Sequence, residues 1–321
     1  MTKLQHIEQE LAYWETERLK LIHPLRQLFW ECTLNCNLSC LHCGSDCKKE
    51  LRTQEMPLAD FLPVLDDIKL HQPNVKTMVY TIGGEPLVRK DILECGRAIT
   101  QKGFYWGTVT NGHLLDSSMM KELKKAGLRT ISVDVDGLKE EHNWLRNNDS
   151  SFDRVYEAIN CIKNTPKLVW DVITCVNHRN LKTLPAIKQM LIEAGVTRWR
   201  CFTIVPMGRA TDNRELLLSD EEFKEFMDFI VVTRREGKIR LSNGCEGFLG
   251  EYEGRVRDHY YSCRAGLTVA SVLSDGGILG CLSIRSDYRQ GNIYEDKFWD
   301  VWNSRFEVYR HREWLYKGHC D

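Results

Sequence analysis

Three cysteines stand close together near the N-terminus of the chain. Cys36, Cys40 and Cys43 follow the spacing C-x3-C-x2-C. Three thiolates on one loop can hold three irons of a cubane iron–sulfur cluster, whereas a closed cluster takes four protein ligands. The fourth iron then stays open, and an open position lets a metal site bind a reactant as well as hold a fold. The spacing therefore favours a reactive iron–sulfur centre.

A structural zinc loop and a group of buried packing thiols are the alternatives. Structural zinc takes four protein ligands, and Cys47 or His42 could supply the fourth. The chain has 13 cysteines in 321 residues. Residues 1–21 contain no uninterrupted apolar segment of the kind that directs secretion, so a disulfide-rich secreted protein is not favoured. In a reducing cytoplasm, where we expect this chain, clustered cysteines are more often metal ligands or catalytic groups.

The elements around these cysteines read as alternating strands and helices between residues 26 and 206. We expect strands at residues 25–31, 75–82, 105–110, 130–135, 168–176 and 199–205, and helices at 58–70, 91–101, 117–126, 152–163 and 181–194. Strands separated by helices of this length indicate a parallel sheet. Six such units suit a partial (β/α)6 barrel of the TIM type, in which functional residues follow the strands.

The pattern changes near residue 237, where we place a domain boundary. Before it, residues 219–235 form a further helix that Ser219 caps. After it come a glycine-rich stretch, a hairpin at residues 268–282 and aromatic helices at 298–302 and 306–316. The expected fold is α/β, with a helical extension at residues 1–24, the barrel at 25–236 and a small α+β domain at 237–321.

Polar motifs follow the later strands. Gly83-Gly84-Glu85-Pro86 comes after the second strand, and Thr110-Asn111-Gly112 comes after the third. Glycines let the backbone approach a ligand closely, although such pairs taken alone are more often turns. The position of both motifs at strand ends favours the functional reading.

The fourth strand carries three polar residues on one face, namely Ser132, Asp134 and Asp136. Just beyond it, His142 and Arg146 are four residues apart and share a helical face. A guanidinium fork suits a carboxylate partner. Asn177 after the fifth strand and Arg209 after the sixth are further candidates for the pocket or for the surface.

With these residues in view, the stretch from Thr33 to Cys43 resembles the cluster loop of the radical S-adenosylmethionine (SAM) superfamily. The resemblance extends over roughly residues 26–210. It implies that Cys36, Cys40 and Cys43 bind a [4Fe–4S] cluster and that SAM chelates its open iron. The site residues that it implies for SAM are His42 beside the adenine, Gly83, Gly84 and Glu85 at the amino group, Asn111 at the pocket edge, Asp134 at the ribose and Arg146 at the carboxylate.

The C-terminal cysteines resemble the SPASM or twitch extension of that superfamily. Cys263 and Cys281 frame the hairpin, with Gly276 five residues before Cys281, and Cys320 stands next to the last residue, Asp321. The resemblance implies that Cys263, Cys281 and Cys320 bind at least one auxiliary iron–sulfur cluster. Cys320 fits the first cysteine of a C-x2-C pair whose second member does not occur in this sequence, so we expect a longer protein or an incomplete ligand set.

The activity that the resemblance implies is reductive cleavage of SAM to methionine and a 5′-deoxyadenosyl radical, which abstracts hydrogen from a substrate. A flavodoxin or ferredoxin is the implied reductant. We expect a ribosomally made peptide or protein as the substrate. Too few residues precede the first strand for a separate peptide-binding domain, so recognition is expected at the barrel mouth and the C-terminal domain.

Two other functions stay open at this point. One is a small-molecule radical SAM dehydrogenase of the twitch type, and the other is a non-catalytic iron–sulfur or zinc protein. The net charge of −1 implies no large single-sign field, so we expect no nucleic-acid partner. No apolar run reaches the roughly 18 residues that a membrane-spanning helix needs, so we expect no membrane partner.

Overall fold

The computed structural model describes residues 3–47, 55–211, 213–244, 247–282 and 288–312. Within these residues, ten strands form one sheet in the order β10-β9-β8-β1-β2-β3-β4-β5-β6-β7. The strands are β1 (Gln27–Thr33), β2 (Met78–Gly83), β3 (Tyr105–Thr110), β4 (Leu128–Asp134), β5 (Val169–Val176), β6 (Arg198–Thr203), β7 (Arg240–Asn243), β8 (Val269–Val272), β9 (Gly277–Leu279) and β10 (Gly291–Asn292).

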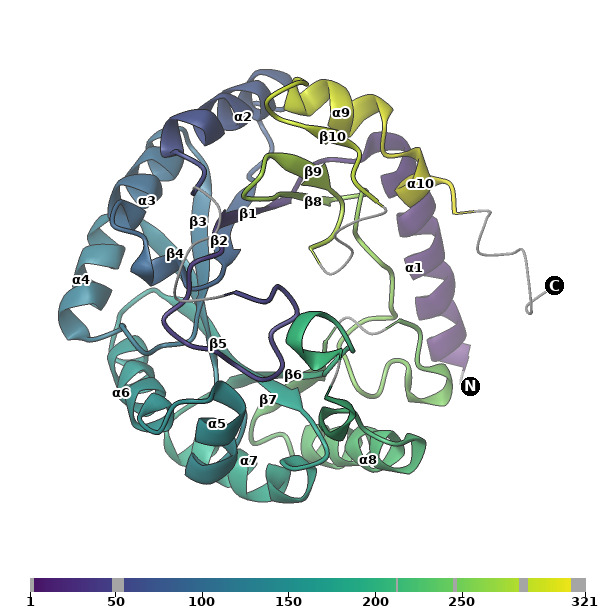
Figure 1. The fold of residues 1–321 in the computed structure, drawn as a ribbon. Coiled ribbons are helices and arrows are strands. Elements are labelled where there is room, and N and C mark those ends of the chain that lie inside the picture. Colours follow the sequence, from purple (N-terminus) through teal and green to yellow (C-terminus); the bar gives the residue numbers. More distant parts are fainter. Residues whose placement is uncertain (1–2, 48–54, 212, 245–246, 283–287, 313–321) are drawn as a thin grey trace.

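The helices lie outside the curved sheet, as Figure 1 shows. They are α1 (Lys3–Ile22), α2 (Leu58–His71), α3 (Ile92–Gln101), α4 (Ser117–Lys125), α5 (Lys139–Arg146), α6 (Ser151–Lys163), α7 (Leu184–Glu193), α8 (Asp220–Glu236), α9 (Phe298–Ser304) and α10 (Glu307–Arg310). Strands β1 to β7 pair only in parallel with their neighbours, which requires crossover helices such as α2 to α8. The predicted partial barrel and its strand–helix alternation are confirmed.

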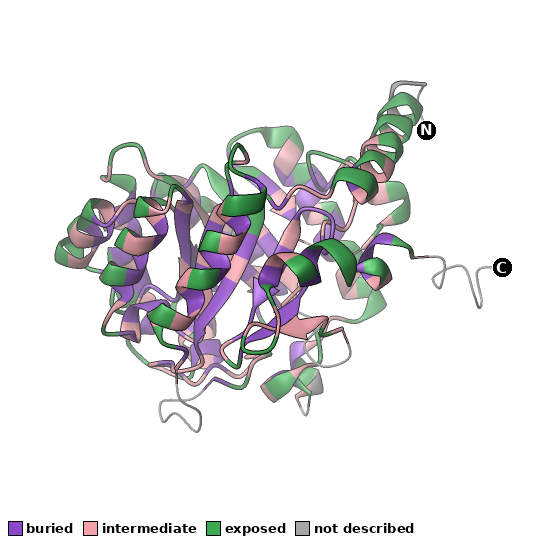
Figure 2. Cartoon of the chain, turned by 90° about the horizontal axis from the view of Figure 1, so that it is seen from above, coloured by how far each residue is buried: buried purple, intermediate pink, exposed green. Residues whose placement is uncertain are grey.

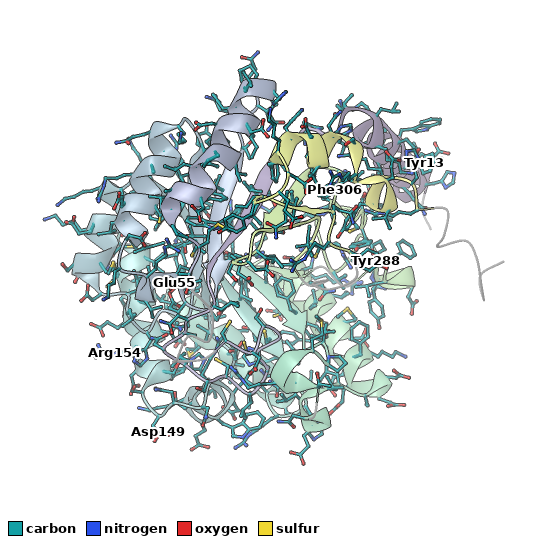
Figure 3. All side chains as sticks on the ribbon, turned by 45° about the horizontal axis from the view of Figure 1, so that its top comes forward. Tyr13, Glu55, Asp149, Arg154, Tyr288 and Phe306 are labelled. Carbon is teal, nitrogen blue, oxygen red and sulfur yellow. The ribbon has the colours of Figure 1, made fainter. Side chains whose placement is uncertain are left out.

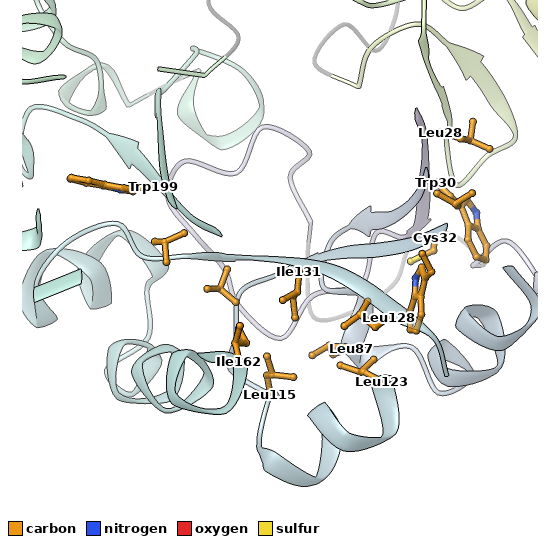
Figure 4. Close-up of a cluster of buried hydrophobic side chains, with 14 of the residues drawn as sticks. Leu28, Trp30, Cys32, Leu87, Leu115, Leu123, Leu128, Ile131, Ile162 and Trp199 are labelled. Atoms are coloured by element: carbon orange, nitrogen blue, oxygen red, sulfur yellow. The ribbon is translucent and has the colours of Figure 1, made fainter. Parts of the chain in front are cut away.

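Along each strand, side chains point alternately toward the helices and into the barrel. On β1, Leu28, Trp30 and Cys32 are fully buried against the helical layer, and Figure 4 shows them within the same apolar cluster as Leu123 of α4 and Ile162 of α6. Figure 2 shows the buried strands enclosed by helices whose outer faces are exposed. The alternate residues of each strand therefore face the barrel interior.

Residues beyond 237 extend both edges of the barrel sheet. Strand β7 pairs in parallel with β6, and β8 pairs in parallel with β1. Strands β9 and β10 then continue antiparallel from β8. The predicted hairpin is confirmed, whereas β7 was not predicted because its short sequence, Arg-Leu-Ser-Asn, lies in a glycine-rich stretch without a continuous apolar run. A domain boundary near residue 237 stays a prediction, since strands on both sides of it share one sheet.

The predicted N-terminal helix is present as α1, but most of its described apolar residues are exposed. Leu11 and Trp14 are 64% and 67% exposed, and Tyr13 projects from the same helix at the edge of the molecule (Figure 3). Leu19, near the C-terminal end of α1, is the buried contact. Of the predicted helix at 306–316, the part from residue 313 lies outside the described residues. No helix in the described part of the chain is long and apolar enough to cross a membrane.

Candidate functional site

The cysteine motif occupies the loop that leaves β1 at the carboxyl end of the sheet. Cys36, Cys40 and Cys43 all line one cavity of about 400 Å³. Together with Leu38 and Cys47, the first two form a small buried cluster against which Cys43 packs. The predicted convergence of the three thiols at a strand end is thus observed.

Arg146 anchors this loop from beneath. Its Nη1 lies 3.8 Å from the Sγ of Cys40. Its Nε donates to Asp136 at 2.6 Å, and its Nη2 lies 2.6 Å from Asp136 and 3.2 Å from Asp134. The two carboxylates raise the pKa of Arg146 against the effect of burial, so the guanidinium stays charged. Every nitrogen of the side chain is therefore engaged by this chain's own groups, although Arg146 also lines the cavity.

Asp136 is the fully buried centre of a wider network. Its backbone N–H donates to the Nδ1 of His142 at 3.0 Å, and the other ring nitrogen of His142 lies 3.1 Å from the hydroxyl of Ser151. The second carboxylate oxygen of Asp136 accepts from the amide of Cys175 at 2.8 Å. Burial lowers the pKa of His142 to about 3, so the ring is neutral and can accept that bond. The predicted shared face of His142 and Arg146 is thus used to hold Asp136.

His42 lines the cavity and also turns toward this network. Its ring, the thiol of Cys175 and the carboxylate of Asp136 lie within 4.8 Å of one another. Burial lowers the pKa of His42 to about 4, and its Nδ1 has no hydrogen-bond partner among the residues that the structure describes. Because Arg146 already neutralises Asp136, these three groups have little excess negative charge to hold a cation.

The glycine motif after β2 packs against the cysteine loop. A Cβ on Gly83, where φ is +127°, would lie 2.0 Å from the carbonyl oxygen of Thr33. A Cβ on Gly84 would lie 2.1 Å from the carbonyl oxygen of Asn35. The amide of Gly84 donates to Thr33 and that of Glu85 to Asn35, at 2.8 and 2.9 Å. Both glycines line the cavity, and their lack of a side chain also lets the two loops touch.

Glu85 itself is fully buried and faces away from open space. One carboxylate oxygen accepts from Leu87 and Thr110, at 3.0 and 2.8 Å, and the other accepts from the amide of Asn111 at 2.7 Å. Burial raises the pKa of Glu85 to about 7. The carboxylate thus joins the end of β2 to the end of β3, whereas the resemblance implied contact with SAM.

Asn111 connects that joint to the cluster loop. Its side-chain amide donates to Asn37 at 2.8 Å and lies 3.9 Å from the Sγ of Cys36. Asn111 and Asp134 both line the cavity, as the motif positions predict. By contrast, Asn177 is buried in a turn with Asn180 and is not among the lining residues.

Arg209 was an open candidate, and the structure gives it a definite role. Its Nε donates to the carbonyl of Cys40 at 2.7 Å, and its Nη1 donates to the carbonyl of Cys47 at 2.8 Å. The same nitrogen lies 2.9 Å from the carboxylate of Asp46. A residue that follows β6 thus fastens the loop that follows β1.

Glu31 is a lining residue that the sequence analysis missed. It is 1% exposed on the interior face of β1, and Ser274 donates to it through its amide and its hydroxyl, at 3.2 and 3.1 Å. The available signal was an acidic residue inside the apolar run Leu-Phe-Trp-Glu-Cys. Leu282 also lines the cavity, so the C-terminal segment reaches the site.

A second cavity, of about 420 Å³, lies deeper in the barrel and shares Phe29 and Val109 with the first. Phe29 stacks on Tyr80, with ring centroids 5.1 Å apart. Further down, Ser132 donates to Asp171 at 2.6 Å and accepts from Arg200 at 3.1 Å, while Arg200 also pairs with Asp171. This cavity is therefore lined by both aromatic and charged side chains.

Cys263 and Cys281 both lie near Tyr309 and are half-buried. Burial raises the pKa of the Tyr309 hydroxyl, and the two thiols add to that shift. Phe306 and Tyr288, labelled in Figure 3, stack on or tilt toward the same ring. Gly276 has a φ of +86° at the hairpin turn. Cys320 and Cys245 lie outside the described residues.

Comparison with known proteins decides the family. Residues 30–191, about half of the chain, match the model of the radical SAM superfamily, and residues 263–321 match the SPASM iron–sulfur cluster-binding domain. The chain belongs to the radical SAM superfamily. It carries a [4Fe–4S] cluster that works with SAM and an auxiliary iron–sulfur cluster. Cys36, Cys40 and Cys43 line one cavity together with Gly83 and Gly84, and this arrangement fits the [4Fe–4S] cluster that works with SAM.

Radical SAM relatives with different activities resemble this chain to a similar degree. It is 27% identical to an AdoMet-dependent heme synthase of Methanosarcina barkeri, over 89% of this chain and 84% of that protein. It is 28% identical to a PqqA peptide cyclase of Granulibacter bethesdensis, over 92% and 79%. Streptococcus suis SuiB, solved with its precursor peptide SuiA, superposes with a TM-score of 0.70 at 19% identity, over 96% of this chain and 71% of that one, which shows a shared fold.

Proposed function

We propose that this radical SAM enzyme modifies a peptide or protein by abstracting hydrogen from one of its residues. In the proposal, Cys36, Cys40 and Cys43 bind the [4Fe–4S] cluster and leave one iron open for SAM. The observation that supports this proposal is the convergence of these thiols on one cavity, which adjoins a second cavity deeper in the barrel at Phe29 and Val109. When bound there, the cluster would supply the electron for cleavage of SAM to methionine and a 5′-deoxyadenosyl radical.

The residues of this chain divide into those that contact SAM and those that hold the contacts in place. Gly83, Gly84, Asn111, Asp134 and His42 line the cavity, so we assign them to SAM contact. Glu85 acts through Asn111, because its carboxylate oxygens are used by backbone amides and a threonine hydroxyl. The guanidinium of Arg146 is occupied as well, so Arg146 holds the loop and the buried carboxylates.

The deeper cavity supports a peptide substrate. At about 420 Å³ it is near the lower end of the range for small-molecule sites. One amino-acid side chain can enter such a space while the rest of the peptide stays at the barrel mouth. Phe29 and Tyr80 offer apolar contact, and the Ser132–Asp171–Arg200 group offers hydrogen bonds. The PqqA peptide cyclase relative supports the same class.

A tetrapyrrole is the second candidate substrate. The heme synthase relative favours it, and so does the presence of Arg198, Arg200 and Arg240 around the deeper cavity. Guanidinium groups bind carboxylates in bidentate fashion, and tetrapyrroles carry several propionate carboxylates. Arg200 and Arg240 are already paired with Asp171 and Asp258, however, which leaves less positive charge for a substrate.

Anaerobic reconstitution tests the proposed chemistry. The protein with iron and sulfide restored should form 5′-deoxyadenosine from SAM under dithionite. Replacing Cys36, Cys40 and Cys43 together with Ala should abolish this product, whereas Cys32→Ala, which removes a thiol outside the cavity, should retain it. A triple variant that still forms 5′-deoxyadenosine would disprove the ligand assignment.

Isotope transfer separates the two substrate classes. Any small peptide encoded beside the gene, made fully deuterated, should transfer deuterium into 5′-deoxyadenosine. A deuterated iron tetrapyrrole with propionate groups should transfer none. The opposite result would replace the peptide proposal by the tetrapyrrole one and leave the radical chemistry intact.

A further inference from the structure

A fourth thiol belongs to the cavity that the three motif cysteines line. Cys47 is 3% exposed and lines that cavity with Cys36, Cys40 and Cys43. Its backbone amide donates to the Sγ of Cys43 at 3.4 Å, so the two cysteines are direct neighbours in the loop. It has the position of a neighbour to the metal site, although the three-cysteine motif does not include it.

The loop is built to return Cys47 to the cavity. Asp46 adopts a left-handed backbone with φ of +48°, which is unfavourable for a residue other than glycine. Arg209 compensates for this by binding the Asp46 carboxylate and the Cys47 carbonyl. Gly208 makes that approach possible, because a Cβ there would lie 2.4 Å from the carbonyl oxygen of Cys43. Two separate segments of the chain therefore hold the fourth thiol beside the other three.

Cys32 provides an internal comparison. It flanks the same loop on its other side and is also fully buried. Its thiol, however, donates to the carbonyl of Ile82 at 3.4 Å and packs in the main core between the sheet and the helices. Cys32 does not line the cavity, so burial near the motif is not enough to bring a thiol to the metal site.

We infer that Cys47 binds the open iron of the cluster when SAM is absent and that SAM displaces it. The inference rests on the proposed assignment of Cys36, Cys40 and Cys43 as the other three ligands. A thiolate is a much better ligand for cluster iron than water, and four thiolates close a [4Fe–4S] cluster. The step is a ligand exchange without change of oxidation state. The Cys47 thiol releases its proton to water when sulfur binds iron, and takes a proton back when the amino and carboxylate groups of SAM replace it.

This exchange has two consequences that can be measured. The SAM-free cluster has no exposed iron, so it resists loss of that iron to oxidants. SAM must also compete with Cys47, so removing the thiol raises the apparent affinity for SAM. If the closed form makes up about 90% of the SAM-free protein, the gain in affinity is about tenfold.

The test compares the wild type with Cys47→Ala, Cys47→Ser and Cys32→Ala, each reconstituted with ⁵⁷Fe in the full chain. Without SAM, the Mössbauer spectrum of the Cys47 variants should contain a distinct iron site that is absent from the wild type and from Cys32→Ala. With SAM, all four proteins should show that site. Any auxiliary cluster contributes equally to each spectrum and cancels in the difference. Ferricyanide should convert the SAM-free Cys47 variants to the [3Fe–4S] form faster than the wild type.

Identical SAM-free spectra and equal rates of iron loss in the wild type and both Cys47 variants would overturn the inference alone. A cluster that responds to SAM in none of the proteins would instead overturn the proposed function. If Cys47→Ala assembles no cluster, Cys47→Ser gives the same comparison with the side-chain volume nearly kept, and its spectrum then decides.

Discussion

Arg146 and the residues around it form a charged group that water barely reaches. Its side chain is 6% exposed and that of Asp136 is fully buried. Removing one partner from a buried ion pair leaves the other charge without compensation, which is costly. Arg146 also donates to the Sγ of Cys40 in the cysteine loop. With Cys40 as a cluster ligand, as proposed, this hydrogen bond would tune the potential of the iron.

Replacing Arg146 with Met should lower the free energy of unfolding by about 3–5 kcal/mol, because Asp136 stays buried and unpaired. Denaturant titration measures this loss. Arg146→Lys keeps the positive charge but not the planar guanidinium, so the free energy of unfolding should fall by less. A loss of SAM affinity by about 1.5–3 kcal/mol in Arg146→Lys, with stability unchanged, would instead show that Arg146 pairs with the SAM carboxylate.

His142 makes stability depend on pH. Its pKa in the folded chain is lowered to about 3, from an ordinary value of 6.5. Between these values the unfolded chain binds a proton that the folded chain does not, so stability falls as pH falls from 6.5 towards 3. His142→Asn keeps an acceptor for Asp136 and removes the titration. The slope of unfolding free energy against pH should then decrease by up to about 1.4 kcal/mol per unit. An unchanged slope would contradict a neutral buried His142.

Loops that follow different strands hold one another at the carboxyl end of the barrel. The loop after β1 hydrogen-bonds to the turn after β2, to Asn111 after β3 and to Leu145 at the end of α5. The turn at residues 206–209, after β6, completes the set through Arg209. Parallel strands bring these loops to one end, so their positions depend on the register of the whole sheet.

Replacing Arg209 with Ala should loosen the cluster loop. It removes donors to Cys40, Cys47 and Asp46, and because Arg209 is 24% exposed, solvent screening limits the effect. We expect the folded loop to be destabilised by about 1–2 kcal/mol, which corresponds to roughly tenfold faster loss of iron to a chelator. Arg240→Ala is the matched control, since Arg240 pairs with Asp258 away from the loop. Equal iron-release rates in the two variants would mean that Arg209 does not position the loop.

The C-terminal segment is joined to the radical SAM barrel at several points. Strand β8 pairs with β1, and Trp302 of α9 donates to the carbonyl of His23, just after α1. Ser274 donates to Glu31, and Leu282 lines the same cavity as Cys36, Cys40 and Cys43. The auxiliary cluster region thus contributes to the wall of the main site.

Replacing Cys263 and Cys281 together with Ser should remove the auxiliary cluster. Iron content should fall by about four atoms per chain if that cluster is a cubane. Residues 255–312 should become more susceptible to protease, because a small metal-bound unit depends on its ligands for stability. Cleavage of SAM without substrate should remain measurable. Equal iron content in the wild type and the double variant would show that these cysteines only pack in the core.

The sequence by itself determined the family, the barrel and the position of the metal motif. Period-two patterns and helix-length spacings identify parallel strands, and parallel strands place Cys36–Cys43, Gly83–Gly84, Asn111 and Asp134 at one end. The barrel and the motif positions need only local patterns and one rule about barrels, whereas the family came from the resemblance of the motifs to those of known proteins.

Only the tertiary structure decided which partner each side chain takes. The resemblance assigned Arg146 and Glu85 to SAM. In the structure the guanidinium of Arg146 donates to Asp136, and the carboxylate of Glu85 accepts from backbone amides. The bond between Ser274 and Glu31 joins residues 243 apart. Cys32 and Cys47 flank one motif with the same chemistry, and only the path of the loop turns one into the core and the other into the cavity. Such pairings depend on distances across the folded barrel, and sequence spacing does not contain them.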